Sequence, residues 1–210
     1  MGAAMISSQL VSTSISDEDL VGLVLGGSAS GKVLFFDRFS PRVERVLYAV
    51  LGPDPEVADV LHEVFLAAFH GLRALRDPTN VKAWITSVAV YTARTWIRKR
   101  QRRRWFHMFV EEIDEEPAPF ASHEVTDALR ATYDILKTLP ENDRIVFSLR
   151  FIEGMALEEV AVVAQVSLST AKRRIARAVK GFLGQARRVP ELETWIADGR
   201  WSEEWRTLCE

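Results

Sequence analysis

The sequence predicts an all-α protein of two small helical domains joined by a flexible acidic linker, with a helix-turn-helix in the second domain. Three observations predict this class: apolar residues recur at steps of three and four, charge is segregated into blocks, and no sustained alternation typical of strands is found. A chain of 210 residues, 48% of them apolar, can bury two modest cores. We expect the first domain at 16–106, the linker at 107–123, the second domain at 124–183 and a C-terminal extension at 184–210.

Three segments of helical periodicity build the predicted first domain. Apolar residues within 34–50 indicate a helix that we expect Pro41 to interrupt and Gly52 to end. Residues 57–72 place apolar side chains on one face of a second helix, and residues 82–100 do the same for a third. These faces predict one helical core.

Charge along the chain is strongly segregated although the net charge is only −2. Residues 94–104 carry seven basic residues and no acid, and a second basic cluster follows at 172–180. Between them lies an acidic stretch at 111–116, followed by Pro117 and Pro119, where helical periodicity lapses. We interpret this stretch as the interdomain linker and the two basic clusters as separate cationic surfaces.

The segment 156–180 has the pattern of a helix-turn-helix. Ala161 and Ala164 supply the small residues that two tightly joined helices need where they cross, and Ser167 or Ser169 can cap the second helix. A solvated basic helix packed on a small bundle is the alternative. The predicted inward residues are Ala171, Ile175 and Ala178, and those available to the major groove and its phosphates are Ser169, Thr170, Lys172, Arg173, Arg174 and Arg177.

Two separate parts of the chain carry a family resemblance. Residues 139–161, beginning LPENDRIVF, and residues 170–178 resemble the promoter-binding C-terminal domain of the extracytoplasmic-function group of bacterial sigma factors. Residues 56–65 resemble the acidic helix by which the N-terminal domain of that family grips the polymerase clamp. Residues 83–98 resemble its promoter-melting helix. The two halves follow one another in the order and at the spacing of the family.

The resemblance implies a transcription initiation factor that binds core RNA polymerase, directs it to specific promoters and assists DNA melting. It implies no enzymatic activity and no cofactor, and it names core RNA polymerase and promoter DNA as partners, with an anti-sigma factor or other regulator as a further candidate. The polymerase-binding residues that it implies are Asp59, His62 and Glu63. The DNA-binding residues that it adds to those of the helix-turn-helix are Arg94, Arg98, Lys99 and Arg102.

The chain departs from the family pattern in both halves. A glutamine is usual in the clamp-binding helix, an asparagine and an aspartate in the melting helix, and a glycine at the helix-turn-helix corner. The residues at these places are His62, Tyr91, Thr95 and Gln165. We expect Gln165 to adopt a positive φ or to shift the turn slightly. Trp84 and Trp96 are interpreted as core residues in preference to base-stacking ones.

Two rival functions each fit part of the sequence. Gly26, Gly31 and Lys32 have the spacing of a phosphate-binding loop, but Val33 follows where that loop needs a Ser or Thr for magnesium, and no strand precedes it. A glycine-rich turn between two helices explains the same residues. The second rival is a helix-turn-helix regulator that acts without recruiting polymerase, which would leave the first domain without a purpose.

Metal chemistry and export are disfavoured. His62 begins a pattern seen in zinc proteases, but the second ligand would fall on Leu66. The single cysteine, Cys209, excludes an internal disulfide and suits a reducing cytoplasm. The apolar run 20–25 is too short for a membrane span and follows acids at 17–19, where a secretory signal would be basic.

The extension after residue 183 is rich in tryptophan. The spacing of Trp201, Trp205 and Leu208 fits one face of a short helix. Packing against the second domain and service as a regulatory latch or regulator-binding surface are both open interpretations.

Overall fold

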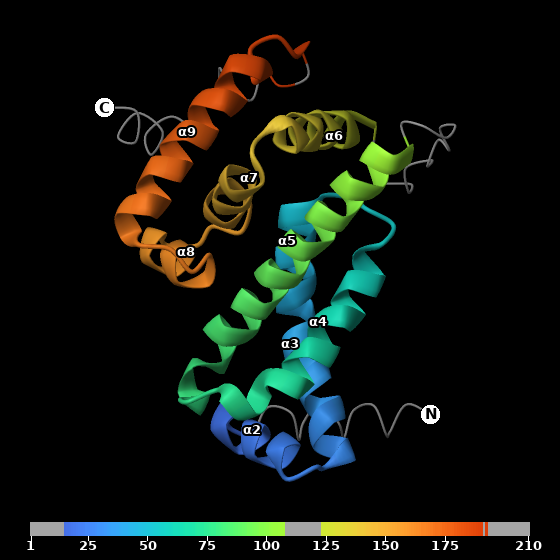
Figure 1. Ribbon diagram of the computed structural model, residues 1–210, viewed down its shortest axis with the longest axis vertical. Helices are drawn as coiled ribbons and strands as arrows, with labels where there is room; N and C mark the ends of the chain where they lie inside the picture. Colours follow the sequence, from blue (N-terminus) through green and yellow to red (C-terminus); the bar gives the residue numbers. More distant parts are fainter. Residues whose placement is uncertain (1–14, 108–122, 191, 193–210) are drawn as a thin grey trace.

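A computed structural model describes residues 15–107, 123–190 and 192, and every regular element in these ranges is helical. Figure 1 shows two groups of helices, α2 to α5 and α6 to α9, stacked along the long axis of the molecule. The all-α prediction is therefore confirmed for the described residues. The acidic stretch at 111–116 and the tryptophans after residue 192 lie outside them.

The first group contains α2 (Asp17–Leu25), α3 (Ala29–Leu51), α4 (Val57–Gly71) and α5 (Val81–His107), with short 3₁₀ turns η1 (Leu72–Ala74) and η2 (Pro78–Asn80) between α4 and α5. The predicted apolar faces of all three long helices are buried together, and α5 packs along both α3 and α4. A cluster of phenylalanines fills the centre, with the Phe35 and Phe39 ring centroids 4.6 Å apart. Helical periodicity thus predicted this core correctly.

Helix α3 runs through Pro41 without a break, so the expected interruption is wrong. A proline inside a helix removes one backbone hydrogen bond and costs about 3 kcal/mol. Here Phe39 and Val43, on either side of Pro41, are both buried in the same core. Beside it, the Arg42 Nε donates to the Thr86 hydroxyl of α5 at 2.9 Å. Tertiary contacts on both sides of the proline therefore keep the helix continuous.

The glycines between α2 and α3 form a helix end and a helix start. The amides of Gly27 and Ser28 donate to the carbonyls of Val24 and Leu23, and Gly27 has φ +83°. This is the Schellman arrangement that ends helices at a glycine. Ser28 then caps α3, because its hydroxyl accepts from the Gly31 amide at 3.0 Å. The interpretation as a turn between two helices is confirmed.

The second group contains α6 (His123–Thr138), α7 (Glu141–Phe147), a π-helical turn η3 (Ser148–Ile152), α8 (Leu157–Val163) and α9 (Leu168–Ala186). Helix α9 packs against α6, α7 and α8. Its inward residues Ala171, Ile175 and Ala178 are buried, as predicted. The helix continues to Ala186, and Leu192 is also buried, so the described structure extends beyond residue 183.

The helix-turn-helix corner has the expected left-handed residue. Gln165 has φ +55°, the one positive φ among the described non-glycine residues. Its amide donates to the Val162 carbonyl, and the Val166 amide donates to the Ala161 carbonyl at 2.9 Å. The corner therefore closes as a Schellman turn with glutamine where glycine is usual.

The two groups of helices share one contiguous set of buried apolar residues. At their boundary the Tyr133 hydroxyl of α6 donates to the Tyr48 carbonyl of α3 at 2.8 Å. The Arg144 guanidinium of α7 donates to the Leu51 carbonyl at 3.0 Å. Both acceptors lie in the last turn of α3, where the Tyr48 carbonyl also accepts from the Gly52 amide at 2.9 Å. The second group of helices thus caps a helix of the first.

Gly52 follows α3 and lies against the Tyr133 ring at this boundary. It has φ +83° and ψ −169°, a conformation largely reserved for glycine, and an added Cβ would lie 2.9 Å from the Tyr133 ring. We expect Gly52→Ala to lower the free energy of unfolding by about 2–4 kcal/mol.

Gly27→Ala is the matched control, because Gly27 shares φ +83° but an added Cβ there would meet nothing within 4 Å. Its cost should be about 1 kcal/mol. Denaturant titration followed by circular dichroism measures both values. Equal losses in the two variants would contradict the role given to the Tyr133 contact.

Candidate nucleic-acid and polymerase interfaces

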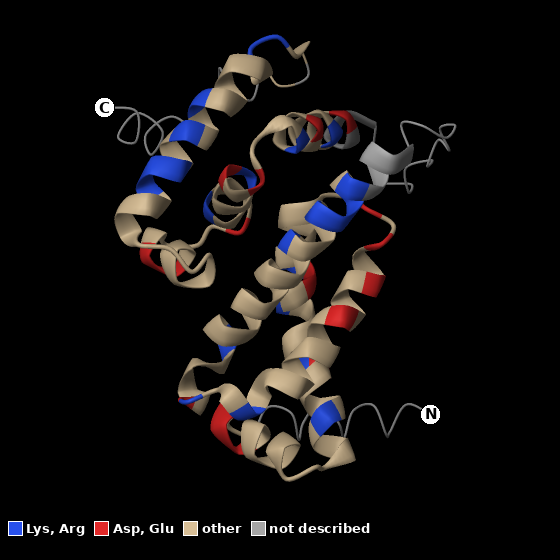
Figure 2. Ribbon diagram, in the orientation of Figure 1, with Lys and Arg blue, Asp and Glu red and all other residues tan. Residues whose placement is uncertain are grey.

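Helix α9 presents a basic surface opposite its buried face. Ser167 caps the helix, its hydroxyl accepting from the Thr170 amide at 3.2 Å, as one of the two predicted caps. Figure 2 shows basic residues along the length of the helix. Of the predicted DNA-binding residues, Thr170 and Arg174 are half-buried, and the exposed ones are Ser169, Lys172, Arg173 and Arg177.

Arg177 also has a structural partner. Its Nε and Nη2 donate to the two carboxylate oxygens of Asp143 at 2.5 and 2.7 Å, and Asp143 is fully buried. Hydrogen bonding and the charge of Asp143 raise the pKa of Arg177 above its ordinary value. Replacing Arg177 would leave a buried carboxylate without its partner, so this residue holds α9 on α7 whatever else it contacts.

The basic part of α5 faces the second group of helices. The Arg98 Nε donates to a Glu141 carboxylate oxygen at 3.0 Å, and the Arg94 Nε lies 3.5 Å from the other oxygen. Arg94 is half-buried, and desolvation lowers its pKa. Lys99 and Arg102 are exposed. The sequence grouped these four residues correctly on one helix, but it did not indicate Glu141 as the partner of Arg94 and Arg98.

The tryptophans of α5 lie against the core, in agreement with the preferred interpretation. Trp84 and Trp96 are both partly buried against it. The Trp96 indole donates to Glu56 at 2.8 Å, and the Arg100 guanidinium lies 4.9 Å from its ring centroid. Tyr91, in contrast, is 64% exposed, which leaves it available to a ligand.

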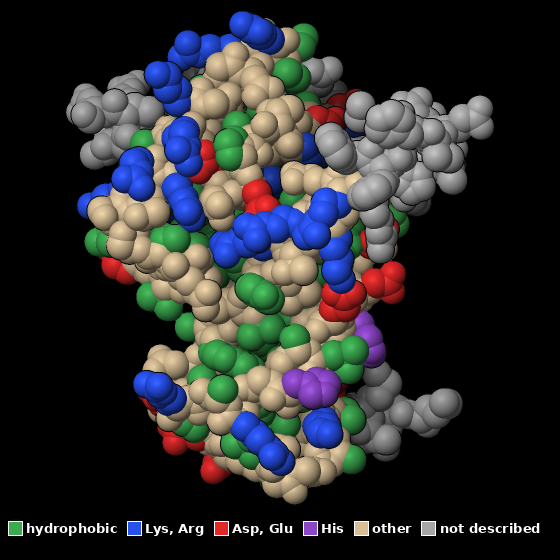
Figure 3. Space-filling model, viewed as in Figure 1, with side chains coloured by type: hydrophobic (Ala, Val, Ile, Leu, Met, Phe, Trp, Pro, Cys, Tyr) green, Lys and Arg blue, Asp and Glu red, His purple; other side chains and the backbone are tan. Residues whose placement is uncertain are grey.

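The two predicted cationic surfaces meet on one face of the molecule. Burial lowers the pKa of Arg94 and the charge of Glu141 raises it, while the nearby charges of Arg98 and of Arg174 on α9 lower it further. Figure 3 shows basic side chains spread over the α9 half of this face and across the part of α5 beside it. Residues about 80 positions apart thus form one basic region, which local sequence patterns could not predict.

The connection between α4 and α5 is organised by one carboxylate. Asp77 accepts from the Thr79 hydroxyl and amide at 2.6 and 3.0 Å and from the Asn80 side chain at 2.5 Å. The hydrogen bonds from Thr79 lower the pKa of Asp77. Arg73 and Arg76 are exposed beside this turn. The connection is therefore an ordered turn with two basic side chains available to a ligand.

Helix α4 carries the predicted polymerase-binding residues on its outer face. Val60, Val64 and Phe65 are buried. The intervening positions Asp59, His62 and Glu63 are all exposed, and Leu66 continues this face at 47% exposure. The helix therefore offers a mixed acidic and apolar surface.

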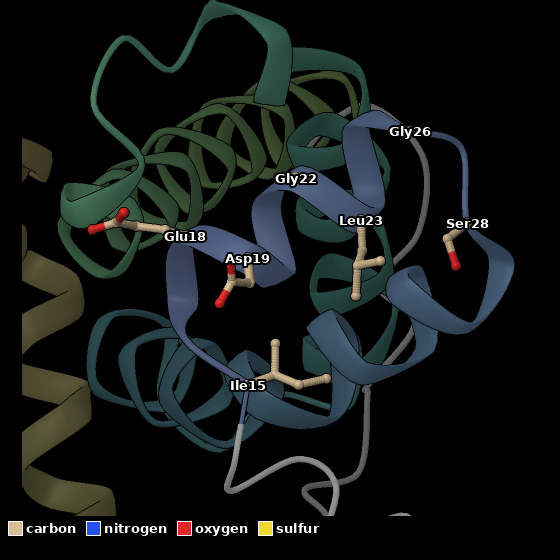
Figure 4. A pocket seen from close by; sticks show the side chains of 7 residues that line it. All are labelled: Ile15, Glu18, Asp19, Gly22, Leu23, Gly26 and Ser28. Atoms are coloured by element: carbon tan, nitrogen blue, oxygen red, sulfur yellow. The ribbon is translucent and has the colours of Figure 1, made fainter.

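The rival nucleotide and metal sites find no support in the described residues. The hollow at the α2–α3 corner, about 650 Å³ in volume, is lined by acids and apolar groups, and no basic residue of the described chain lines it. Figure 4 shows Glu18 and Asp19 at this hollow, where they would repel phosphate. An added Cβ on Gly31 would lie 2.9 Å from the Leu23 Cβ, so close packing explains this glycine. No group of three potential metal ligands occurs within the described ranges.

Sequence comparisons match both halves of the chain. The profile of sigma-70 region 2 matches residues 35–103, and that of sigma-70 region 4 matches residues 129–180. The chain is 26% identical over 179 residues to the ECF RNA polymerase sigma-E factor of Escherichia coli K12, covering 80% of this chain and 93% of that protein. It is 26% identical over 138 residues to RNA polymerase sigma factor SigV of Bacillus subtilis, covering 65% and 79%.

Two solved structures share the fold. CnrH, in complex with the cytosolic domain of CnrY, has a TM-score of 0.57 at 22% identity, with 80% of this chain and 95% of that chain covered. The sigma factor RpoE of Bartonella quintana, in complex with the anti-sigma factor NepR, has a TM-score of 0.54 at 19% identity, with 74% and 95% covered. No described helix is long and apolar enough to cross a membrane.

Proposed function

The chain belongs to the extracytoplasmic-function group of sigma factors, and we propose that its two halves divide the work of transcription initiation between them. As a sigma factor it is a transcription initiation factor that binds core RNA polymerase and promoter DNA. In the division that we propose, α4 holds polymerase, α5 and the turn before it hold the unpaired strand, and α9 reads duplex DNA.

The observation that supports this proposal is that α9 and α5, two helices of different character, both expose basic residues. Helix α9 is the second helix of a helix-turn-helix and exposes Lys172 and Arg173, which suits the major groove. The region of α5 with Tyr91 and Lys99 combines an exposed aromatic ring with cations, as surfaces for single strands do. A regulator without polymerase needs only the first of these, so that alternative is not favoured.

The same assignment indicates where the protein acts and what controls it. Polymerase and promoters are cytoplasmic, and the single cysteine suits that compartment. Both structural neighbours are complexes, one of them with an anti-sigma factor. An anti-sigma factor is accordingly the regulator that we propose for this chain.

Run-off transcription with core polymerase and a promoter library tests the function as a whole. The purified chain should confer start-site selectivity that core polymerase alone lacks, and it should co-purify with the core enzyme. Transcription that starts at the same places with and without the chain would refute the assignment.

Arg173→Ala tests the recognition helix. Arg173 is exposed on α9 with no ion pair among the described residues, so its loss should act on DNA and not on folding. We expect binding of the holoenzyme to its promoter to weaken by about 1–3 kcal/mol if the guanidinium contacts a base, and by less if it meets phosphate. Electrophoretic mobility shift at fixed salt measures the change.

Arg188→Ala is the control for this variant, because Arg188 is exposed just beyond the end of α9. It should leave promoter binding nearly unchanged. Arg177→Ala is less informative, since it also breaks the ion pair with buried Asp143. Identical promoter affinity in the wild type and Arg173→Ala would show that the recognition surface lies elsewhere.

Reversing charge on α4 tests the polymerase surface. Changing both Asp59 and Glu63 to lysine should weaken the affinity for core polymerase roughly tenfold or more, because like charges at an interface are strongly unfavourable. Both residues are exposed, so folding should be retained. The matched control changes Asp37 and Glu44, two exposed acids of α3, to lysine. Equal affinities for the two double variants, measured by fluorescence titration, would exclude α4 as the contact.

A further inference from the structure

The charge of the chain changes sign abruptly after α9. Residues 164–190 contain seven basic residues and no acidic one, and Figure 2 shows the basic residues along the length of α9. Residues 193–210, which lie outside the described part of the chain, contain five acidic and two basic residues. This acidic segment, residues 193–210, therefore follows closely on the helix that we assign to duplex DNA.

The cations of α9 are mostly open to a ligand. Arg177 pairs with buried Asp143, and it is the one residue of α9 that forms an ion pair with another described residue. Lys172, Arg173 and Lys180 are all exposed. The helix thus presents a row of positive charge that the described residues neutralise at one position.

The chain turns back at the end of α9 and is anchored there. The Arg188 and Val189 amides donate to the Gln185 and Ala186 carbonyls at 2.9 and 3.1 Å, and the Leu192 amide donates to the Val189 carbonyl at 3.0 Å. The Leu192 side chain is buried in the same apolar core as α9. The acidic segment is therefore tethered to the C-terminal end of the basic helix.

The acidic segment is long enough to cover α9. A helix of 19 residues is about 28 Å long. Residues 193–210 can span up to about 60 Å when extended, so their acids can reach every exposed cation of the helix. A short tether also raises the effective concentration of the attached segment to the order of millimolar. A contact of low intrinsic affinity is then sufficient to occupy the helix.

Apolar side chains at the helix-turn-helix corner offer a second kind of contact. Val162 of α8 is 62% exposed, and Leu168, the first residue of α9, is 39% exposed. In the acidic segment, Trp201, Trp205 and Leu208 have the spacing of one helix face. Aromatic residues are enriched where one protein surface covers another. The segment therefore matches α9 and its corner in both charge and apolar character.

We propose that the acidic segment lies across the exposed face of α9 as an intramolecular latch, with its acids on the cations of the helix and its tryptophans on the apolar corner. Duplex DNA and the segment then compete for the same guanidinium and ammonium groups. The free chain consequently binds duplex DNA more weakly than the exposed helix would. This inference rests on the proposed role of α9, but the contact itself can be measured without DNA.

Paramagnetic labelling of the full chain tests the contact. Cys209 is the single cysteine, so a nitroxide can be attached within the acidic segment without any substitution. The label should broaden the backbone amide signals of α9 from Ser169 to Arg177 and leave those of α4 unchanged, and reduction of the nitroxide should restore the signals. Unbroadened signals from Ser169 to Arg177 would overturn the proposal.

Glu203→Gln combined with Glu204→Gln tests the charge of the latch. The double variant should bind a fluorescein-labelled duplex of 20 base pairs roughly threefold to tenfold more tightly than the wild type, measured by fluorescence anisotropy at fixed salt. Asp37→Asn combined with Glu44→Gln is the matched control, because it makes the same change in net charge at two exposed positions of α3. Equal duplex affinities of the two double variants would rule out the latch.

Trp201→Ala combined with Trp205→Ala separates docking of the segment from the mere proximity of its acids. This variant keeps every charge, so tighter duplex binding reports that the segment has been released from α9. It should bind the same duplex more tightly than the wild type and show weaker nitroxide broadening from Ser169 to Arg177. Wild-type affinity together with wild-type broadening would contradict the docking of the tryptophans.

Transcription separates a failure of the latch from a failure of the proposed function. A wild-type chain that confers no start-site selectivity on core polymerase refutes the proposed function, whereas the nitroxide measurement still decides whether the segment lies on α9. A chain that confers selectivity, but whose duplex affinity is unchanged by the replacement of Glu203 and Glu204, overturns the latch alone.

Discussion

The C-terminal end of α3 is the constraint on which the arrangement of the two halves depends. The last carbonyls of a helix carry partial negative charge, which favours hydrogen-bond donors and cations at this end. Here the carbonyls of Tyr48 and Leu51 accept from Tyr133 and Arg144. Burial lowers the pKa of Arg144 and raises that of Tyr133 to about 12, chiefly by desolvation. The polar groups of this boundary are thus withdrawn from water together.

Helix α7 links this boundary to both basic helices. Glu141 and Asp143 are two positions apart, so they point about 200° apart around the helix axis. Glu141 contacts Arg94 and Arg98 of α5, and Asp143 contacts Arg177 of α9. One short helix therefore contacts the recognition helix on one side and the basic part of α5 on the other.

Local pattern predicted most of the fold and the location of the basic surfaces. The periodicity of 57–72, the burial of Ala171 and the positive φ of Gln165 all follow from neighbours in sequence. The continuity of α3 through Pro41 does not, because it depends on the core that forms on both sides. The partners of Arg94 and Arg177 do not follow from sequence neighbours either. Glu141 and Asp143 lie 47 and 34 residues away, and local propensity carries no information about such pairs.

The distribution of charged residues on the surface, and not the net charge, determines how this chain can bind DNA. A net charge of −2 gives no overall attraction to a polyanion. At physiological salt, exposed charges farther apart than about 8 Å are largely screened, so distant acids weaken a basic surface little. Glu141 is 3.0 Å from Arg98 and mostly buried, so salt screens it poorly. Glu141 beside Arg94 and Arg98, and Asp54 beside Arg100, therefore weaken the positive charge of α5, whereas more distant acids affect it little.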